Sequence, residues 1–274
     1  VAVWNGAAEA HDIERLEDEL SAPPGDVGVL QVVVLVVAHQ DGAEADAPAP
    51  GIGIAADDEF LPGAFATFDE VLEDADQLVY FLGEAVQERD GTPSNRADDY
   101  NVLVYAYAIE PSERTLGPLR LGHVIPYCKI YRRSFIESSA LRFDTVSVSN
   151  DVAFNVLAAV QATNVRAEPL PVYRIYRRGE SLTANVSSET FLTRFEVSRS
   201  LAERLSDLGV EKARPATGYM VNALAYGPRV TARVWQQAIV SPLLVEWSRI
   251  INISRWVQFF NQRRHLKKEQ RRNL

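Results

Sequence analysis

Two segments of the chain, PYCKIYRRSF (126–135) and PVYRIYRRGE (171–180), carry nearly the same pentapeptide. It reads KIYRR at residues 129–133 and RIYRR at residues 174–178. Each segment is short, rich in β-branched and aromatic residues, and bounded by Pro, Gly or Ser, which predicts a β-strand. These two strands indicate a β-sheet in the second half of the chain, and the other elements are assigned around them.

The similarity between the two segments extends beyond the pentapeptide. Residues 125–147 and 170–198 share a Pro, the basic-Ile-Tyr-Arg-Arg run, a Ser-Ser pair, an Arg-Phe-acid triplet and a final Val-Ser. The offset between them grows from 45 residues at the pentapeptide to 52 at the Arg-Phe pair, so one segment would carry an insertion. The pattern is compatible with a duplicated supersecondary unit, or with chance similarity between two strands of one sheet.

Alternation along a strand places every second side chain on the same face. In each copy that face would carry a cation, a tyrosine and a second cation, namely Lys129, Tyr131 and Arg133 in the first and Arg174, Tyr176 and Arg178 in the second. Such a face could bind nucleic acid, because the cations neutralise phosphates while the tyrosine offers a stacking plane. The alternative is a solvated strand face on which arginines lie over tyrosines with modest cation–π stabilisation.

The first 95 residues have the pattern of an acidic, helix-rich part with one buried strand. Apolar residues recur at spacings of three and four within residues 6–20 and 65–89, which predicts two helices. Residues 27–39, VGVLQVVVLVVAH, form a nearly continuous β-branched run, as in strands that are buried on both faces. The polar stretch 90–99, which contains Gly and Pro, predicts a linker.

Residues 96–274 have the pattern of a basic, β-rich part that ends in a long helix. Short β-branched and aromatic segments predict strands at 101–109, 119–125, 127–135, 141–149 and 171–178. Helices are predicted from the N-cap candidates Asn150 and Asp151 to about residue 162, at 199–209, and after Ser241-Pro242. The predicted fold class is therefore α+β: an acidic helical N-terminal part, a central antiparallel or mixed sheet, and a long C-terminal helix. The two parts, 1–95 and 96–274, could also form one continuous domain.

Charge is distributed unevenly along the chain. The net charge is −9, but residues 1–100 contain 23 Asp/Glu and 3 Lys/Arg, whereas residues 101–274 contain 14 Asp/Glu and 25 Lys/Arg. This polarity favours a polyanionic partner for the basic part, or head-to-tail contact between copies of the chain. The alternative is that the two parts neutralise each other within one fold.

The C-terminal tail, NQRRHLKKEQRRNL (261–274), carries six Lys/Arg against one Glu. These cations are further candidates for a nucleic-acid contact: Arg263, Arg264, Lys267, Lys268, Arg271 and Arg272. The segment before the tail is rich in large apolar residues, which predicts a helix that packs in a core or against a partner.

Composition and motifs restrict the remaining possibilities. The chain has 274 residues, 47% hydrophobic and 24% charged, which is typical of a globular protein, and its single Cys128 excludes an intramolecular disulfide. The longest apolar run, at 32–37, is short of the about 20 residues that span a bilayer, so no membrane-spanning segment is predicted. No nucleotide-binding or metal-binding motif is present and the four histidines are scattered, so we predict neither a cofactor nor a metal site.

One segment, SALRFDTVS (139–147), resembles the active-site helix of ribosome-inactivating RNA N-glycosidases. That family requires a Glu three residues before the Arg, and Ser139 stands at that position before Arg142. The required spacing does occur between Glu246 and Arg249. The resemblance implies an alternative in which Glu246 is the catalytic acid and Arg249 stabilises the departing charge.

The function predicted from the sequence is a non-enzymatic structural or assembly protein, of the virion-shell or nucleoprotein kind. It would associate with copies of itself and contact RNA or DNA through its basic half, in the cytoplasm or in a virion rather than after secretion. The alternatives are a nucleic-acid-directed enzyme such as an RNA N-glycosidase-like toxin, and a docking subunit of a larger cellular complex.

Overall fold

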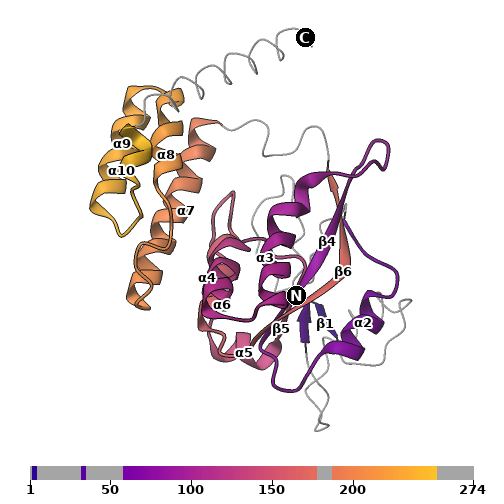
Figure 1. Cartoon of the computed structure of the whole chain (residues 1–274). Helices are drawn as coiled ribbons and strands as arrows, with labels where there is room; N and C mark the ends of the chain where they lie inside the picture. Colours follow the sequence, from indigo (N-terminus) through magenta and orange to yellow (C-terminus); the bar gives the residue numbers. More distant parts are fainter. Residues whose placement is uncertain (1, 5–31, 35–57, 178–186, 252–274) are drawn as a thin grey trace. The chain divides into compact units, whose positions relative to one another are not determined.

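The computed structural model describes residues 2–4, 32–34, 58–177 and 187–251 (Figure 1). Contacts divide the chain into two compact units, Val1–Asn185 and Val186–Leu274. The first unit combines helices with a mixed β-sheet, so the predicted α+β class is confirmed. The boundary predicted between residues 95 and 96 falls inside this unit, where strands from both sides of it pair.

The described sheet of the first unit has the strand order β1-β2-β5-β4-β6-β3. Its strands are β1 (Ala2–Trp4), β2 (Val32–Val34), β3 (Glu59–Phe60), β4 (Leu78–Gln87), β5 (Lys129–Arg132) and β6 (Val165–Arg177). β4 and β6 are parallel and the other neighbouring pairs are antiparallel, so the sheet is mixed. Strands form at both copies of the pentapeptide and pair with opposite edges of the central strand β4. The strand predicted at 127–135 is shorter than expected, because residues 133–135 are helical.

Strand β4 lies within residues 65–89, which the apolar spacing predicted as one helix. Helix α2 (Ala64–Val71) accounts for the first part of that segment, and the helix prediction for residues 78–87 is wrong. The sequence LVYFLGEAVQ is apolar at odd and even positions alike, as a strand covered on both faces requires. A short apolar run of this kind fits a helix or a buried strand equally well, so its spacing alone was not decisive.

Two segments with strand-like composition, 101–109 and 119–125, contribute to helices instead. Helix α3 (Asp98–Ile109) follows the 3-10 turn η1 (Asn95–Ala97), and α4 (Glu113–Gly122) comes next. The first turn of α3 contains Asp98 and Asp99, whose negative charge stabilises a helix N-terminus. Both strand predictions were wrong because β-branched and aromatic residues reflect packing against neighbours more than an intrinsic backbone preference.

Two further helices complete the first unit. Helix α5 (Arg133–Ser138) follows β5 directly, and α6 (Val152–Gln161) confirms the helix predicted after Asn150 and Asp151. Residues 141–149, predicted as a strand, form neither helix nor strand.

Helices cover both faces of the sheet: Figure 1 shows α2 on one side and α3, α4 and α6 on the other. On the α2 side, Ile130 of β5 joins a buried cluster with Phe68 and Phe81. On the other side, Tyr131 packs edge-to-face against Phe154 of α6, with ring centroids 5.6 Å apart. Successive residues of β5 therefore enter two different cores.

The pairing of β4 with β6 is irregular beside Gly83, and a side chain of α3 compensates there. Asn101 donates from Nδ2 to the Gly83 carbonyl over 2.8 Å and accepts from the Gly83 N–H over 3.0 Å. A Cβ at residue 83 would lie 2.8 Å from the Cys128 sulfur, so a larger residue there would force the Cys128 side chain to shift. These bonds fix α3 onto the sheet.

The second unit is helical in its described part. Its elements are α7 (Ser188–Asp207), α8 (Thr217–Ala223), the 3-10 turn η2 (Leu224–Tyr226), α9 (Pro228–Val240) and α10 (Trp247–Ile251). The helix predicted at 199–209 is confirmed within α7, which begins earlier because Ser187 Oγ accepts the Thr190 N–H over 3.1 Å. Large apolar side chains from three helices form its core, including Phe195, Met220 and Val234.

The C-terminal helix predicted to start at Ser241-Pro242 starts later: residues 241–246 are not helical, Leu244 forms a bridge with Pro215, and α10 begins at Trp247. Most of its predicted length, like the helix predicted at 6–20 and the basic tail, lies outside the described residues. Among the helices that are described, none is long and apolar enough to span a membrane.

Candidate functional site

The first copy of the repeat does not form an exposed cationic face. Lys129 is 2% exposed and Tyr131 is 0% exposed, beneath the helices on the α6 side of the sheet. Their burial opposes the predicted contact of these two side chains with nucleic acid. Alternation does place them on a common face, and helices cover that face.

Lys129 and Tyr131 belong to a buried group that we call the lysine cluster. Its other members are Asn155, His123 and Tyr80, whose ring centroid lies 5.2 Å from Lys129 Nζ. The Lys129 amine donates to the His123 carbonyl over 2.6 Å and to Asn155 Oδ1 over 3.0 Å. The Tyr131 hydroxyl donates to the same Oδ1 over 2.8 Å. One buried amide oxygen thus joins both residues of the predicted face to helix α6.

Burial disfavours charge on the titratable groups of the lysine cluster. It lowers the pKa of the Lys129 amine well below its ordinary value. Burial, with a smaller contribution from Lys129, also lowers the pKa of the His123 imidazole. The pKa of Tyr131 is raised well above its ordinary value by the same cause. Burial thus favours the uncharged form of each group, and hydrogen bonds to Asn155 join Lys129 and Tyr131 within the core.

Two atoms of the lysine cluster have no hydrogen-bond partner in the structure, the Tyr80 hydroxyl and His123 Nδ1. An amine and an imidazole with lowered pKa values can act as general bases in enzymes. Here both groups are almost completely buried, so a substrate would have to displace the helices above the sheet to reach them. We therefore assign the cluster to the core rather than to catalysis.

The second copy of the repeat lies among carboxylates. Arg174 pairs with Glu59 of β3 and Glu84 of β4, which stand opposite it on the two neighbouring strands. Its guanidinium donates to Glu59 over 2.8 Å and to Glu84 over 3.2 Å, and the Tyr176 hydroxyl donates to Glu59 over 2.9 Å. Two carboxylates neutralise one cation at this position, which opposes the phosphate contact predicted for Arg174.

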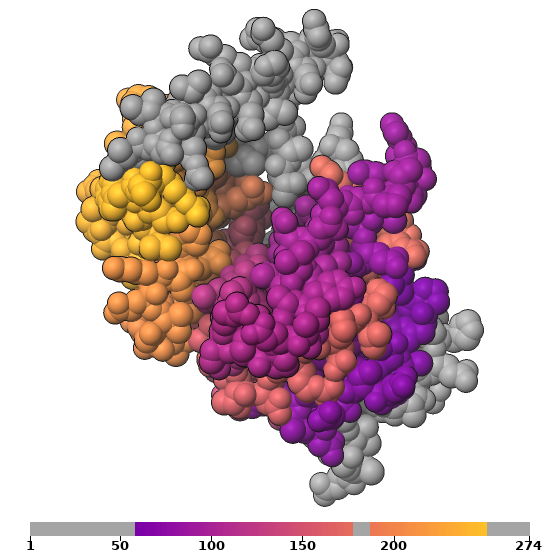
Figure 2. All heavy atoms as spheres, in the orientation of Figure 1, coloured from indigo at the N-terminus to yellow at the C-terminus, as the bar shows by residue number. Residues whose placement is uncertain are grey.

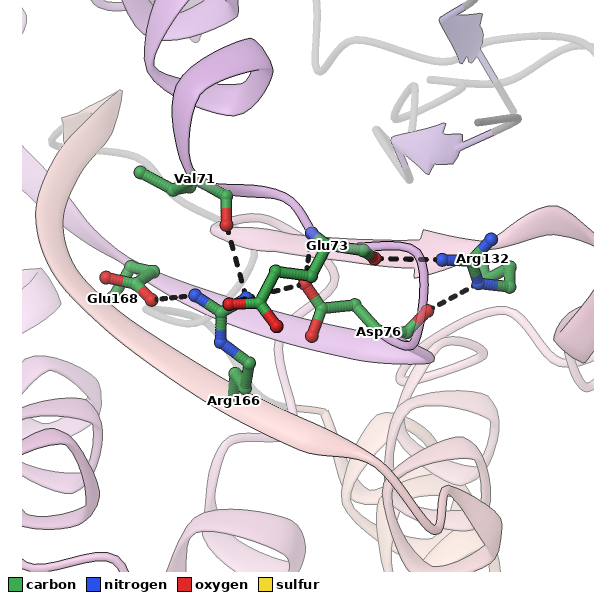
Figure 3. Close-up of polar contacts among 6 residues, drawn as sticks. All are labelled: Val71, Glu73, Asp76, Arg132, Arg166 and Glu168. Atoms are coloured by element: carbon green, nitrogen blue, oxygen red, sulfur yellow. Dashed lines mark hydrogen bonds and ion pairs between the residues drawn. The ribbon is translucent and has the colours of Figure 1, made fainter. Parts of the chain in front are cut away.

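Arginines near the repeat hold the loop between α2 and β4, as Figure 3 shows. Arg132 donates to the carbonyl of Asp76 over 2.6 Å and to the carbonyl of Glu73 over 2.9 Å. Arg166 reaches the same loop from β6 and forms ion pairs with Glu73 at 3.0 Å and with Asp76 at 2.9 Å. These two basic side chains therefore bind backbone and carboxylates of their own unit.

The other predicted nucleic-acid contacts are placed as follows. Arg133 is the first residue of α5 and forms an ion pair with Glu137, one turn later, at 2.6 Å. Arg178 and the tail cations Arg263, Arg264, Lys267, Lys268, Arg271 and Arg272 lie outside the described residues. The predicted contact of Arg178 and the tail cations with nucleic acid therefore stays a prediction.

The acid and cation of the alternative enzyme hypothesis lie together in the second unit. Glu246 precedes α10, and its Oε1 lies 2.9 Å from Nε of Arg249. The Glu246 N–H donates to Thr217 Oγ1 over 2.8 Å, which fixes the start of this turn to α8. A glutamate–arginine pair three residues apart is also a common surface ion pair, so the geometry alone assigns it no chemistry. Among the described residues no group of His, Cys, Asp and Glu is placed to hold a metal ion.

Helix α3 is apolar on both sides, and one side is uncovered. Val104 is completely buried against the rest of the unit, whereas Val102 is 64%, Tyr105 46% and Ile109 80% exposed. Spacings of three, four and seven residues place these exposed side chains on one line, which we call the outer face of α3. In Figure 2 the magenta atoms of this part of the chain lie at the front of the molecule.

The second unit also exposes large apolar side chains. Ile239 and Val240 end α9, and both lie in the solvent together with Trp247 of α10. The same unit has a shallow depression of about 510 Å³. The residues that line it precede these three in the sequence: Leu224, Gly227, Pro228, Thr231, Ala232 and Trp235. These residues form a less regular surface than the single line on α3.

The outer face of α3 was missed because residues 101–109 were predicted as a strand. Two features of the sequence could have identified it. Asp98 and Asp99 precede the segment, as at many helix N-termini, and Val102, Tyr105 and Ile109 recur with helical spacing.

Comparison of the sequence with protein-family models and with curated proteins finds no match. The function is therefore argued from the described residues. Packing within the described part of the first unit accounts for the lysine cluster and for Arg132, Arg166 and Arg174. Among the described residues of that unit, none covers the outer face of α3.

Proposed function

We propose that the protein is a non-enzymatic assembly protein, of the virion-shell or nucleoprotein kind, whose copies associate through the outer face of α3. The observation that carries the proposal is the line of exposed apolar side chains at Val102, Tyr105 and Ile109. Helices that are apolar all round are normally buried on all sides. Contact with a second protein would bury the apolar side of α3 that is exposed in this unit.

The energy available at this face is substantial. Burying an aliphatic side chain completely contributes about 1.5–3 kcal/mol, and a contiguous exposed patch is a more specific sign of an interface than scattered residues. The three side chains lie on one rigid helix, which Asn101 fixes to the sheet. Association would therefore require little ordering of the surface, which favours affinity.

The predicted contact with RNA or DNA is a separate part of the proposal. Among the described cations of the repeat, Lys129 is buried, Arg133 and Arg174 form ion pairs, and Arg132 donates to backbone carbonyls, whereas Arg177 is exposed. A nucleic-acid contact would therefore depend on Arg177, on Arg178 and on the tail, where the sequence concentrates positive charge.

Sedimentation velocity over a wide range of protein concentration tests the proposal. The variant Val102→Gln/Tyr105→Gln/Ile109→Gln, the α3 variant, keeps good helix formers at all three positions but removes the apolar line. We expect it to weaken self-association by more than about tenfold. A tenfold change in the dissociation constant corresponds to about 1.4 kcal/mol, and the three lost apolar contacts together should exceed this value.

The matched control is Leu224→Gln/Ile239→Gln/Val240→Gln, which removes three exposed apolar side chains from the second unit. We expect it to associate as the unchanged protein does. A protein that stays monomeric at every concentration, or an α3 variant that associates normally, would overturn the proposal. A monomer that binds other proteins of a cellular complex through α3 would favour the docking-subunit alternative.

A second candidate, an RNA N-glycosidase-like enzyme, is favoured only by the 2.9 Å contact between Glu246 and Arg249. The variant Glu246→Ala, incubated with purified RNA beside the unchanged protein, separates the two proposals. Base release that disappears in the variant would favour the enzyme, and we expect no base release from either protein.

A further inference from the structure

We infer that the outer face of α3 binds the C-terminal segment 252–274 of a neighbouring copy, so that copies join head to tail. The inference rests on the proposed function and names the partner of the same face. It follows from the shape of the face, the charges around it, and the residues that segment 252–274 would bring.

The outer face of α3 is a narrow apolar strip with acidic ends. Val102 and Ile109 are seven residues apart, so the strip is about 10 Å long at 1.5 Å per residue. Exposed carboxylates stand at one end on Asp98 and Asp99 and at the other on Glu110 and Glu113. The strip therefore fits a segment that offers a few large apolar side chains followed by positive charge.

The charges at the two ends of the strip are only partly neutralised. Glu110 forms an ion pair with Arg114 at 2.6 Å, and Arg96 is a second cation near the start of the helix. Within the described part of the chain no ion pair involves Asp98 or Asp99. Residues 58–177 as a whole carry 18 Asp/Glu and 11 Lys/Arg, a net charge of −7.

Segment 252–274 has the complementary composition. It contains seven Lys/Arg and one Glu, a net charge of +6 with His265 neutral. Before its cationic run stand Trp256, Phe259 and Phe260, whose spacing of three and four is that of one helix face. Opposite charge steers two surfaces together and fixes their orientation, while the aromatic residues supply the affinity.

A contact between a tail and α3 is heterologous, because the two copies present different surfaces. Such contacts extend from copy to copy and close into rings or continue as larger assemblies, whereas a symmetric contact between two α3 helices stops at a dimer. The head-to-tail arrangement therefore fits a shell or nucleoprotein better than a symmetric one does.

A complementation experiment with the full chain tests this inference. The tail variant Trp256→Gln/Phe259→Gln/Phe260→Gln has an intact α3, and the α3 variant has an intact tail. We expect each variant alone to associate about tenfold more weakly than the unchanged protein. Mixed together, the two should form a heterodimer in sedimentation velocity, because each supplies the half that the other lacks.

Charge variants give a second readout. Asp98→Asn/Asp99→Asn should weaken association about threefold at low salt and have little effect at high salt, where such charges are screened. Asp69→Asn/Glu70→Gln removes two exposed acids from α2 instead and should leave association unchanged. Helix content by circular dichroism should be the same in both variants.

The outcomes separate this inference from the proposed function. If the α3 variant is monomeric while the tail variant associates normally, self-association through α3 stands and the tail is not its partner. If the tail variant associates more strongly than the unchanged protein, the tail covers α3 of its own copy, which overturns the inference. If it associates normally but no longer binds RNA, the segment is a nucleic-acid contact, and the inference is likewise overturned.

Discussion

Strands β5 and β6 carry nearly the same residues, KIYR and RIYR, in opposite environments. In β5, Lys129 and Tyr131 are buried and share an acceptor on Asn155. In β6, Arg174 and Tyr176 remain partly exposed and share an acceptor on Glu59. Alternation decides which side chains share a face, whereas the elements packed on that face decide whether it meets water.

The largest expected difference between the two copies concerns the tyrosines. Tyr131→Ala removes a completely buried ring and should lower the free energy of unfolding by about 3–5 kcal/mol, as for other buried aromatic residues. Tyr176→Ala removes a partly exposed ring with one hydrogen bond and should cost about 1 kcal/mol. Urea denaturation of both variants measures the difference, and equal losses would contradict the assignment of the two environments.

The second difference concerns the response to pH. The folded Lys129 amine has a pKa below the ordinary lysine value, so at pH values between these two pKa values the unfolded chain binds a proton that the folded chain lacks. The contribution of Lys129 should therefore raise the free energy of unfolding as pH increases towards about 10.4, by up to about 1.4 kcal/mol per pH unit.

Lys129→Met isolates this contribution. The variant should lose that part of the pH dependence and be at least as stable as the unchanged protein near neutral pH, because a buried amine is replaced by an apolar group of similar volume. Arg174→Met serves as the control and should leave the slope unchanged. A slope that is identical in the unchanged protein and in Lys129→Met would refute the burial of a neutral amine.

The smallest effect is expected for the ion pairs of the second copy. Arg174→Gln should lower the free energy of unfolding by less than about 1 kcal/mol, because its bonds to Glu59 and Glu84 are exposed to solvent. The loss should shrink further at high salt. Denaturation at two salt concentrations measures this loss. A large loss that does not depend on salt would show that the Arg174 side chain is shielded from solvent, as that of Lys129 is.

Part of the fold could be predicted from local patterns. The strands at the two pentapeptides, helix α6 after its N-cap residue, and part of helix α7 all have short-range signals that the structure confirms. Segments that are apolar at odd and even positions alike were harder. Residues 78–87 and 101–109 both have such a pattern, and one became the central strand while the other became α3.

The candidate site could be predicted even less. Whether Lys129 meets water depends on α6, which starts 23 residues later in the chain and supplies Asn155. Arg174 is neutralised by residues 115 and 90 positions away, in β3 and β4. Partners at such distances leave no local signal, so a cationic pattern on a strand identifies a face but not its surroundings.

The most direct test of the account is chemical modification of tyrosines, measured residue by residue, in dilute and in concentrated protein. Tyr131 should be unreactive in both, because it is buried in each copy, and Tyr176 should react in both. Tyr105, on the outer face of α3, should react in dilute protein and become protected as copies associate. A reactive Tyr131, or a Tyr105 whose reactivity does not change with concentration, would contradict the account.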